Sequence, residues 1–503
     1  MTQKYGDEKV FAPGTVIISA GAEVSDVKKT ISPVLVNDSR TAVYYIDFSF
    51  DKHKLGGSVL AQTLNKLGDE VPTVQDAEYF KAAFDSIQEL IGKDLILAGH
   101  DISEGGMLTT LLEMNFANTQ GGLSVKLDGI AESSLINILF AENPGVLIQV
   151  KEKRTVEKLL EANGVGFARI AEPIKERRLE IHKKSVSYTF SINELRDIWF
   201  RSSYLLDRKQ SGEVCASARF SNYKNQPLEF EFNKSFNGKL SQFGLSQDRT
   251  TSGIRAAIIR DKGTNGDREM AYALYLAGFD VKDVHMTDLA TGRETLEDVN
   301  MIVFCGGFSN SDVLGSAKGW AGGFLYNEKA KLALDNFYKR TDTLSLGICN
   351  GCQLMIELGL VTPDHDVKPR MKHNDSHKFE SGFIGLTIPE NNSVMLGSLS
   401  GSKLGVWVAH GEGKFYLPRE ENKYNIIAKY TYSGYPANPN GSDYGVAGIC
   451  STDGRHLAMM PHPERAIFPW QWAHYPADRK ANDQITPWVE AFVNARKWVE
   501  KNI

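Results

Sequence analysis

With 503 residues, of which 42% are apolar and 24% charged, the chain has the composition of an ordinary globular protein, and its length predicts about three domains. Its 57 basic and 62 acidic residues give a net charge of -5, without the basic stripe typical of nucleic-acid-binding proteins. No apolar run reaches the length of a membrane helix, and five cysteines, an odd number, favour a reducing compartment over a disulfide framework. We therefore expect a cytoplasmic protein that binds neither nucleic acid nor membranes.

The first region, residues 10–190, alternates short apolar runs with helical patterns. We expect strands at 15–19, 42–46 and 95–99, and helices at 76–91 and 155–161, the former because its apolar residues recur about every 3.6 positions. The mixture predicts an α+β or α/β domain. The third strand runs into His-Asp-Ile-Ser-Glu-Gly-Gly, a loop that contains Asp101 and Ser103.

Residues 191–252 form a polar connector, for which we expect a helix at 195–208 and a short strand at 228–232. Residues 253–503 then alternate strands and helices: strands at 256–260, 301–304 and 344–346, and helices around Met270 and at 328–339. This alternation predicts an α/β domain whose parallel sheet carries a ligand site at the carboxyl ends of its strands.

A Gly-Ile-Cys-Asn-Gly sequence at 347–351 separates a strand from a helix, which is the pattern of a nucleophile elbow with Cys349 as the nucleophile. The glycines permit a sharp turn that leaves the cysteine strained and exposed, and the helix dipole favours its thiolate. Backbone groups of Asn350, Gly306 and Gly307 are candidates to stabilise an oxyanion. Two alternatives are a buried structural cysteine and a redox pair of Cys349 with Cys352.

The downstream sequence Met-Pro-His-Pro-Glu-Arg at 460–465 supplies a second group of candidates. We expect its two prolines to hold the segment extended, so that His462 and Glu464 lie near the same face. His462 is then a candidate general base and acid for Cys349, and Glu464 fixes its tautomer and orientation. A surface histidine in a proline-rich turn is the alternative for this segment taken alone.

Long stretches of the chain resemble the phosphoribosylformylglycinamidine synthase family of purine biosynthesis, and residues 253–503 resemble a class I glutamine amidotransferase domain of flavodoxin-like fold. The shared stretches are IIRDKGTNGDREMAYALYLAGFDVKDVHMTDLATGR, CGGFSNSDVLGSAKGWA, LGICNGCQLM, HGEGKF, YPANPNGS, MMPHPERA and PWVEAFVNARKW. The whole chain is similar to the C-terminal part of the large single-chain members. The resemblance implies an ATP-dependent C–N ligase that takes ammonia from glutamine.

Upstream, LAGHDISEGG and LGGSVLAQ are similar to the C-terminal domain of aminoimidazole ribonucleotide synthetase. This resemblance implies that Asp101 is a magnesium ligand and Ser103 a nucleotide contact, with ATP/ADP and Mg²⁺ as cofactors. A carboxylate beside phosphates suits Mg²⁺, although a simple turn cap is the alternative. The family's other metal ligands, its N-terminal synthase half and most contacts to formylglycinamide ribonucleotide precede the matching residues, so we expect one part of a larger or split enzyme.

The expected reaction is cysteine-dependent hydrolysis of glutamine to glutamate and ammonia, and in the whole enzyme the ammonia converts formylglycinamide ribonucleotide to the amidine with release of ADP and phosphate. We expect this chain alone to be a glutaminase. The rivals are a cysteine hydrolase or peptidase on the same scaffold, and a non-catalytic piece whose residues 14–190 bind ADP. Two runs, GFSNSDVLG and NDSHKFESGF, depart from the family pattern, and His410 and Glu412 stay outside the predicted catalytic set.

Overall fold

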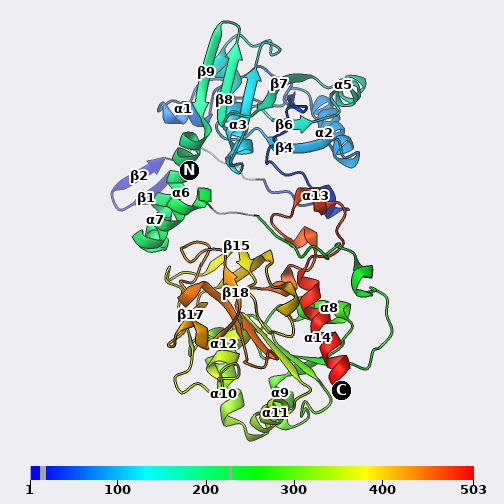
Figure 1. Ribbon diagram of the computed structural model, residues 1–503. Helices are drawn as coiled ribbons and strands as arrows, with labels where there is room; N and C mark the ends of the chain where they lie inside the picture. The colour runs from blue at the N-terminus through cyan, green and yellow to red at the C-terminus, as the bar shows by residue number, and fades with distance from the viewer. Residues whose placement is uncertain (1, 12–17, 226–228) are drawn as a thin grey trace. The chain divides into compact units, whose positions relative to one another are not determined.

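The computed structural model describes residues 2–11, 18–225 and 229–503, which form two compact units, 1–193 and 194–503 (Figure 1). The first unit begins with an antiparallel ribbon of β1 (Thr2–Tyr5) and β2 (Glu8–Phe11). Most of the strand expected at 15–19 lies outside the described residues, and Ile18 and Ser19 belong to no strand. Within the described ranges, no helix is both long and apolar enough to cross a bilayer.

A seven-stranded sheet with the order β4-β6-β3-β7-β5-β8-β9 forms the centre of the first unit, and all its strand pairs are antiparallel except β5 with β8. Its strands are β3 (Ala42–Asp47), β4 (Ile96–Asp101), β5 (Gly122–Lys126), β6 (Gly145–Val150), β7 (Phe167–Ile174), β8 (Arg178–Lys183) and β9 (Val186–Ser191). The helical elements are η1 (Val27–Lys29), α1 (Val59–Thr63), α2 (Ala77–Gly92), α3 (Gly106–Phe116), α4 (Leu135–Phe140) and α5 (Lys153–Ala162).

The two predicted helices of this unit pack together over the sheet. Asp76 caps α2 by accepting hydrogen bonds from two backbone N–H groups of its first turn, and Asn163 and Gly164 end α5 as their turn chemistry predicts. Apolar side chains of α2 and α5 form one buried core with Tyr44 and Ile148 of the sheet. The observed unit is α+β, one of the two classes that the pattern left open, because all but one of its strand pairs are antiparallel.

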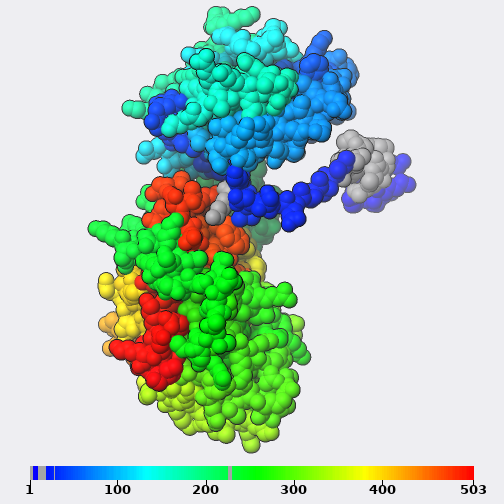
Figure 2. Space-filling view, turned by 90° about the vertical axis from the view of Figure 1, so that its right-hand side faces the viewer, coloured from blue at the N-terminus to red at the C-terminus, as the bar shows by residue number. Residues whose placement is uncertain are grey.

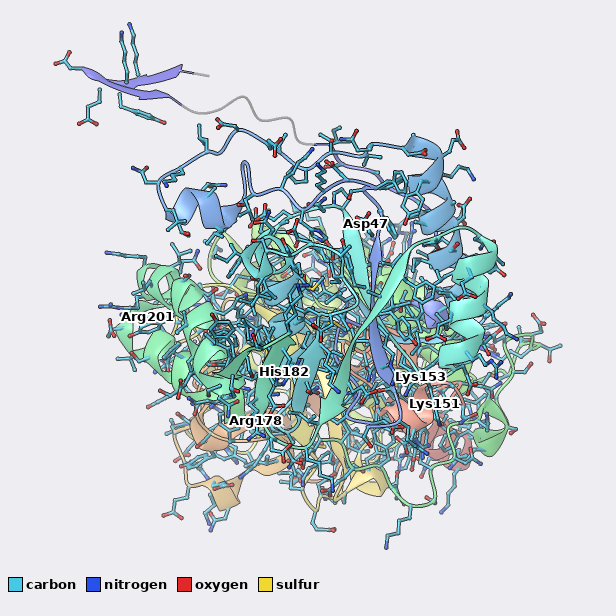
Figure 3. All side chains as sticks on the ribbon, turned by 90° about the horizontal axis from the view of Figure 1, so that it is seen from above. Asp47, Lys151, Lys153, Arg178, His182 and Arg201 are labelled. Carbon is cyan, nitrogen blue, oxygen red and sulfur yellow. The ribbon has the colours of Figure 1, made fainter. Side chains whose placement is uncertain are left out.

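Strand β8 shows how alternation separates the core from the solvent. Leu179 and Ile181 are buried, whereas Arg178, Glu180 and His182 point to the opposite face, since successive side chains of a strand alternate. Glu180 accepts from Arg178 at 2.6 Å and lies 3.7 Å from His182, and Figure 3 shows the two basic residues on this strand.

The connector region is helical at its start, and from Glu194 onward it belongs to the second unit. It contains α6 (Ile192–Gln210), α7 (Gly212–Asn222), η2 (Tyr223–Asn225) and η3 (Leu240–Phe243). The strand expected at 228–232 is wrong where the structure describes it: Glu231 forms only an isolated bridge to Lys403. Phe230 and Phe232 of this stretch pack against the apolar core and against Trp472, so side-chain packing holds the segment in place of a ladder of backbone hydrogen bonds. The three-part division of the chain stays a prediction.

The second unit contains a nine-stranded sheet with the order β11-β10-β12-β13-β20-β19-β18-β15-β16. Its strands are β10 (Arg255–Arg260), β11 (Asp280–His285), β12 (Met301–Phe304), β13 (Leu344–Ile348), β15 (Glu380–Thr387), β16 (Lys403–His410), β18 (Asn425–Tyr430), β19 (Val446–Cys450) and β20 (His456–Met459), beside a small pair of β14 (Arg370–Lys372) and β17 (Lys414–Tyr416). The helical elements are α8 (Asp267–Ala277), α9 (Met286–Thr291), η4 (Ser309–Asp312), α10 (Lys318–Tyr326), α11 (Glu328–Lys339), α12 (Asn350–Glu357), η5 (Gly397–Leu399), η6 (Glu421–Lys423), η7 (Asp443–Gly445), η8 (Pro463–Arg465), η9 (Pro469–Gln471), α13 (Ala477–Lys480) and α14 (Trp488–Asn502).

Strands β11, β10, β12, β13 and β20 run parallel, and the remaining strands extend the sheet in antiparallel pairs. Parallel strands need crossover connections, and here helices α8 to α12 lie between successive strands of the parallel part of the sheet. Helix α8 packs against α14, the red helix on the surface of this unit in Figure 2, and α9 to α11 pack against one another. Three neighbouring strands, β12, β13 and β20, thus end at the same edge, just before Gly306, Cys349 and His462.

Candidate active site

Cys349 occupies a strained turn between β13 and α12. Its backbone has φ 53° and ψ −108°, a conformation that L-residues rarely adopt. A Cβ at Gly351 would lie 2.0 Å from the Phe304 carbonyl oxygen, so the following helix can approach β12 this closely only with glycine there. The prediction of strain is met, but the expected exposure is not, because Cys349 is only 5% exposed and its thiol lies 3.6 Å from the Ala409 carbonyl oxygen of β16.

His462 and Glu464 are brought together by a 3₁₀ turn, η8, instead of the extended segment that the prolines predicted. Pro463 takes the first position of that turn, where its fixed φ and missing N–H suit a helical start. The His462 Nδ1–H donates to Glu464 Oε1 at 2.6 Å, and each side chain is 2% exposed. The His462 N–H donates to the Trp407 carbonyl at 2.9 Å, which anchors the turn to β16.

The charge of Glu464 decides the protonation of His462. Burial by itself lowers the pKa of the imidazole, but Glu464 and a hydrogen bond with the Cys349 side chain outweigh burial and raise this pKa to about 10. The imidazole is therefore protonated at neutral pH. One nitrogen is held by the carboxylate and the other side of the ring lies at the cysteine, so the three side chains form a Cys-His-Glu arrangement.

Gly306 lies against both Cys349 and His462. A Cβ at this position would be 2.9 Å from His462 Cε1 and 3.3 Å from Cys349 Cβ, so a side chain would displace one of them. Its carbonyl accepts from the Asn265 N–H at 2.9 Å, and Gly307 forms a bridge with Thr264, which fixes the loop after β12. The expectation that this loop borders the nucleophile agrees with the geometry.

The structure narrows the set of oxyanion donors. The Phe308 N–H donates to the Gly263 carbonyl at 2.8 Å, and the Ser309 N–H donates to Asn350 Oδ1 at 3.0 Å, so these two groups are engaged elsewhere. The Asn350 N–H is at the first position of α12, among the donors that a helix leaves without an internal partner. The backbones of Asn350, Gly306 and Gly307 remain the candidate donors.

The side chain of Asn350 is a structural feature that the motif did not predict. Besides Ser309, it contacts Asp312 Oδ1 at 3.2 Å and Gln353 Oε1 at 2.9 Å. Gln353 in turn donates to the Glu412 carbonyl at 2.8 Å. This network ties the loop after β12, the first turn of α12 and the HGEG segment together around the cysteine.

A cavity of about 380 Å³ opens beside this network, and Gln353 and Glu412 are part of its wall. Its other lining residues are mostly charged or polar: Ser316, Lys318, Glu357, Met371, Lys372, His373, Asp375 and Lys414. Because both carboxylates and lysines line it, this cavity suits a ligand that carries both an ammonium and a carboxylate.

His410 is the clearest residue that sequence reasoning left out. It is buried at the end of β16, and neither ring nitrogen has a hydrogen-bond partner within the described residues. Burial, and then the charge of His462, lower its pKa to about 3, so the ring is neutral. The HGEG run at 410–413 was the signal in the sequence that could have identified His410. Its separation from Cys349 along the chain does not show how close the two segments lie in the folded protein.

The first unit places Asp101 and Ser103 close together at the end of β4, and both are exposed, with 74% of the Asp101 side chain accessible. His100 Nδ1 lies 3.3 Å from the Asp101 carboxylate. Glu142 accepts from the Gly105 N–H at 2.9 Å and from the first N–H of α1 at 2.8 Å, which joins the HDISEGG loop to the LGGSVLAQ run. His100 and Asp101 also line a cavity of about 350 Å³ with mainly apolar walls.

These residues fit Mg²⁺ only in part. Among the described residues, no group of three or more His, Cys, Asp or Glu side chains is arranged to hold a metal ion. Asp101 provides one hard oxygen ligand, and Mg²⁺ is commonly bound by one or two carboxylates together with phosphate oxygens and water. Asp101 is thus suited to a metal that arrives with a nucleotide.

Comparison with known proteins assigns families to both units. Residues 49–184 match the AIR synthase related protein, C-terminal domain, and residues 253–499 match the CobB/CobQ-like glutamine amidotransferase domain. The predicted fold class, an α+β synthetase-like domain followed by an α/β amidotransferase domain, is confirmed.

The chain is 39% identical to the probable phosphoribosylformylglycinamidine synthase, chloroplastic/mitochondrial, of Arabidopsis thaliana, over 98% of this chain and 36% of that protein. It is 38% identical to the phosphoribosylformylglycinamidine synthase of Homo sapiens, over 99% of this chain and 39% of that protein. Among solved structures, PurLQS from Thermotoga maritima is 25% identical with a TM-score of 0.38, over 50% of this chain and 99% of that one. The chain thus spans less than two fifths of the length of these two relatives, and it belongs to the phosphoribosylformylglycinamidine synthase family, as a homologue of the C-terminal portion of its large members.

Proposed function

We propose that the chain is the glutaminase part of a phosphoribosylformylglycinamidine synthase and hydrolyses glutamine to glutamate and ammonia. The observation that carries this proposal is the meeting of Cys349, His462 and Glu464 beside Gly306, at the carboxyl ends of three adjacent parallel strands. A strained cysteine, a histidine oriented by a carboxylate and a glycine-rich backbone loop are the parts that acyl transfer needs.

In the proposed reaction the Cys349 sulfur attacks the side-chain amide carbon of glutamine, and the C–N bond breaks. His462 gives a proton to the leaving nitrogen, so ammonia departs and a glutamyl thioester remains on the cysteine. A water molecule then loses a proton to His462 and attacks the thioester, which releases glutamate and the thiol. The backbone N–H groups of Asn350 and Gly307 stabilise the negative oxygen of both tetrahedral intermediates.

The cavity next to Gln353 and Glu412 is the proposed site for the amino-acid end of glutamine. Its carboxylates suit the ammonium group, and Lys318, Lys372 and Lys414 suit the carboxylate. A peptide substrate lacks both charges at the residue to be cleaved, so this lining favours free glutamine over the rival peptidase activity.

In the whole enzyme, the proposed use of this ammonia is ATP-dependent conversion of formylglycinamide ribonucleotide to its amidine. A structure entitled T. maritima PurL complexed with ATP, which is 14% identical to this chain with a TM-score of 0.27, reports that nucleotide for that protein. For this chain, we assign Asp101 to a Mg²⁺ that accompanies ATP or ADP, and Ser103 to the nucleotide. All five cysteines are free thiols, which supports a reducing compartment such as the cytoplasm.

Glutamate release from L-glutamine tests the proposal, with wild type, Cys349→Ala and the control Cys450→Ala compared. Cys450 is buried at the end of β19, where it pairs with Leu457 near the start of β20, so its loss leaves the residues beyond the carboxyl end of β20 intact. We expect release by wild type and the control, and a loss of at least about a thousandfold in Cys349→Ala. Cleavage of peptides without release from glutamine would instead support the peptidase.

A further inference from the structure

Charged side chains join the helix pair α6–α7 to the amidotransferase sheet. The Arg219 guanidinium on α7 lies 2.9 Å from Asp207 of α6 and 3.4 Å from Glu380 at the start of β15. Both carboxylates are buried, with exposed fractions of 7% and 6%. Tyr435 donates to the second oxygen of Glu380 at 3.0 Å, and its ring lies 4.8 Å from the guanidinium carbon. Arg219 therefore neutralises two carboxylates that have little access to water.

Glu380 is connected to the nucleophile, Cys349, through one pair of neighbouring strands. It pairs with His410 in the antiparallel register of β15 and β16. The residue before His410 is Ala409, whose carbonyl accepts from the Cys349 thiol at 3.6 Å. A shift of Glu380 would thus be passed across one strand pair to the backbone that contacts the cysteine.

A second chain of contacts connects Asp207 with the HGEG segment. Lys378 lies 3.3 Å from Asp207, and its carbonyl accepts from the Asn374 side chain at 3.1 Å. Asn374 also donates to the His410 carbonyl at 2.7 Å and accepts from the Gly413 N–H at 2.9 Å. The amide of Asn374 therefore clamps both ends of the HGEG segment, and the clamp is attached to α6.

We propose that Arg219 is a positioning residue for the glutaminase site: by holding Asp207 and Glu380, it fixes the HGEG segment against Cys349 and beside the glutamine cavity. The proposal rests on the proposed glutaminase function. The sequence suggested that the connector region only links two domains. The proposal gives its helices α6 and α7 a direct effect on the chemistry of the amidotransferase domain.

The physical reason is the cost of leaving a buried charge unpaired. Removing Arg219 leaves Glu380 without a counter-ion and Asp207 with Lys378 as its remaining partner, so the loop that carries Lys378 and Glu380 must move to hydrate Glu380. Displacement of a positioning segment by a fraction of an ångström is enough to slow a reaction, because the attacking and accepting atoms lose alignment.

The test uses the full chain with Arg219→Met, Arg219→Lys, Glu380→Gln and the double variant Arg219→Met with Glu380→Gln. Arg208→Met is the matched control, because Arg208 pairs with Glu213 at 2.5 Å on the exposed side of the same two helices. Two quantities are measured: kcat and KM for glutamine hydrolysis, and the rate at which iodoacetamide alkylates Cys349, followed by mass spectrometry. The melting temperature of each variant shows whether it is folded.

We expect Arg219→Met to lower kcat/KM by about tenfold and to change the alkylation rate, with Arg208→Met within about twofold of wild type. Arg219→Lys should lose less, since it keeps the charge without the two-pronged geometry. The double variant should recover part of the loss, because it removes the unpaired carboxylate at Glu380; a merely structural role for Arg219 would change the melting temperatures without changing kcat/KM or the alkylation rate of the folded protein.

Wild-type kcat/KM and alkylation in a folded Arg219→Met variant would overturn the proposal, as would losses that simply add in the double variant. If the wild type releases no glutamate, the proposed function fails. The alkylation rates still decide the positioning role in that case, and equal rates in wild type and Arg219→Met overturn it.

Discussion

Glu464 lies 2.6 Å from Nδ1 of His462, in a turn where each side chain is 2% exposed. A buried carboxylate in this position fixes the orientation of the ring and keeps Nδ1 protonated. The opposite side of the ring is thereby turned to Cys349 and Gly306. The pair explains why the imidazole can carry a positive charge inside the protein.

Replacing Glu464 with glutamine should lower glutaminase activity by about a hundredfold and shift its pH dependence. The variant loses the charge that raises the pKa of His462 to about 10, and burial then lowers that pKa. The imidazolium is consequently lost at a lower pH, and the alkaline limb of the rate profile moves toward acid. Initial rates across the pH range check this, and an alkaline limb at the wild-type pH would contradict it.

Replacing Gly306 with alanine should abolish activity and leave the fold intact. The new Cβ would lie 2.9 Å from His462 Cε1, and a misplacement of the imidazole by about 1 Å is expected to cost about a hundredfold. Gly382→Ala is the matched control, because no heavy atom lies within 4 Å of its added Cβ. Equal rates for the two variants would remove Gly306 from the site.

The second unit should lose stability in mild acid because His456 is buried as a neutral ring. Burial, and then Arg455, lower its pKa from 6.5 to about 4, while its Nδ1 accepts from Ser345 at 3.0 Å. As pH falls from 6.5 toward 4, the unfolded chain binds a proton that the folded chain refuses. Each pH unit in this window costs up to about 1.4 kcal/mol.

Thermal unfolding at several pH values measures that effect. His456→Gln should be less stable at neutral pH, through loss of the Ser345 contact, but its stability should fall less steeply in acid. His410 keeps part of the slope, because its pKa is also lowered. A slope identical to that of wild type would show that the pKa of His456 is the same in the folded and the unfolded chain.

Removing the Asp101 carboxylate should weaken binding of ADP in the presence of Mg²⁺. The side chain is exposed and free to approach a metal–phosphate group, and its loss takes one charged oxygen from the site. Calorimetry on wild type and Asp101→Ala, with Asp94→Ala as an exposed control, measures the difference, for which we expect about tenfold or more. Equal affinities would exclude Asp101 from the site.

The local elements of the chain were predictable because their signals are local. The apolar period gave α2 and α11, and Asp76 and Gly278 mark a start and an end through hydrogen bonds within a few residues. The elbow around Cys349 is encoded in five consecutive residues. At 228–232 the short strand pattern was misleading, because Glu231 forms only one bridge, to Lys403, while Phe230 and Phe232 pack against the core.

Long-range arrangement required the tertiary structure. The residue types in the motifs identify Cys349, His462 and Glu464, but only the order β12-β13-β20 places them at one edge of the sheet. The burial of Cys349 and the 3₁₀ turn at Pro463 follow from packing against β16, which lies between the two motifs in the sequence.

The sequence by itself therefore determined the elements, the nucleophile elbow and the resemblance to a family, since each depends on residue identity or short spacing. Tertiary structure alone decided which backbone donors remain for an oxyanion, how near His410 lies to the cysteine, and that Arg219 reaches Glu380 across 161 positions. Such contacts arise from the packing of distant segments, and their energies depend on burial, which no local pattern records.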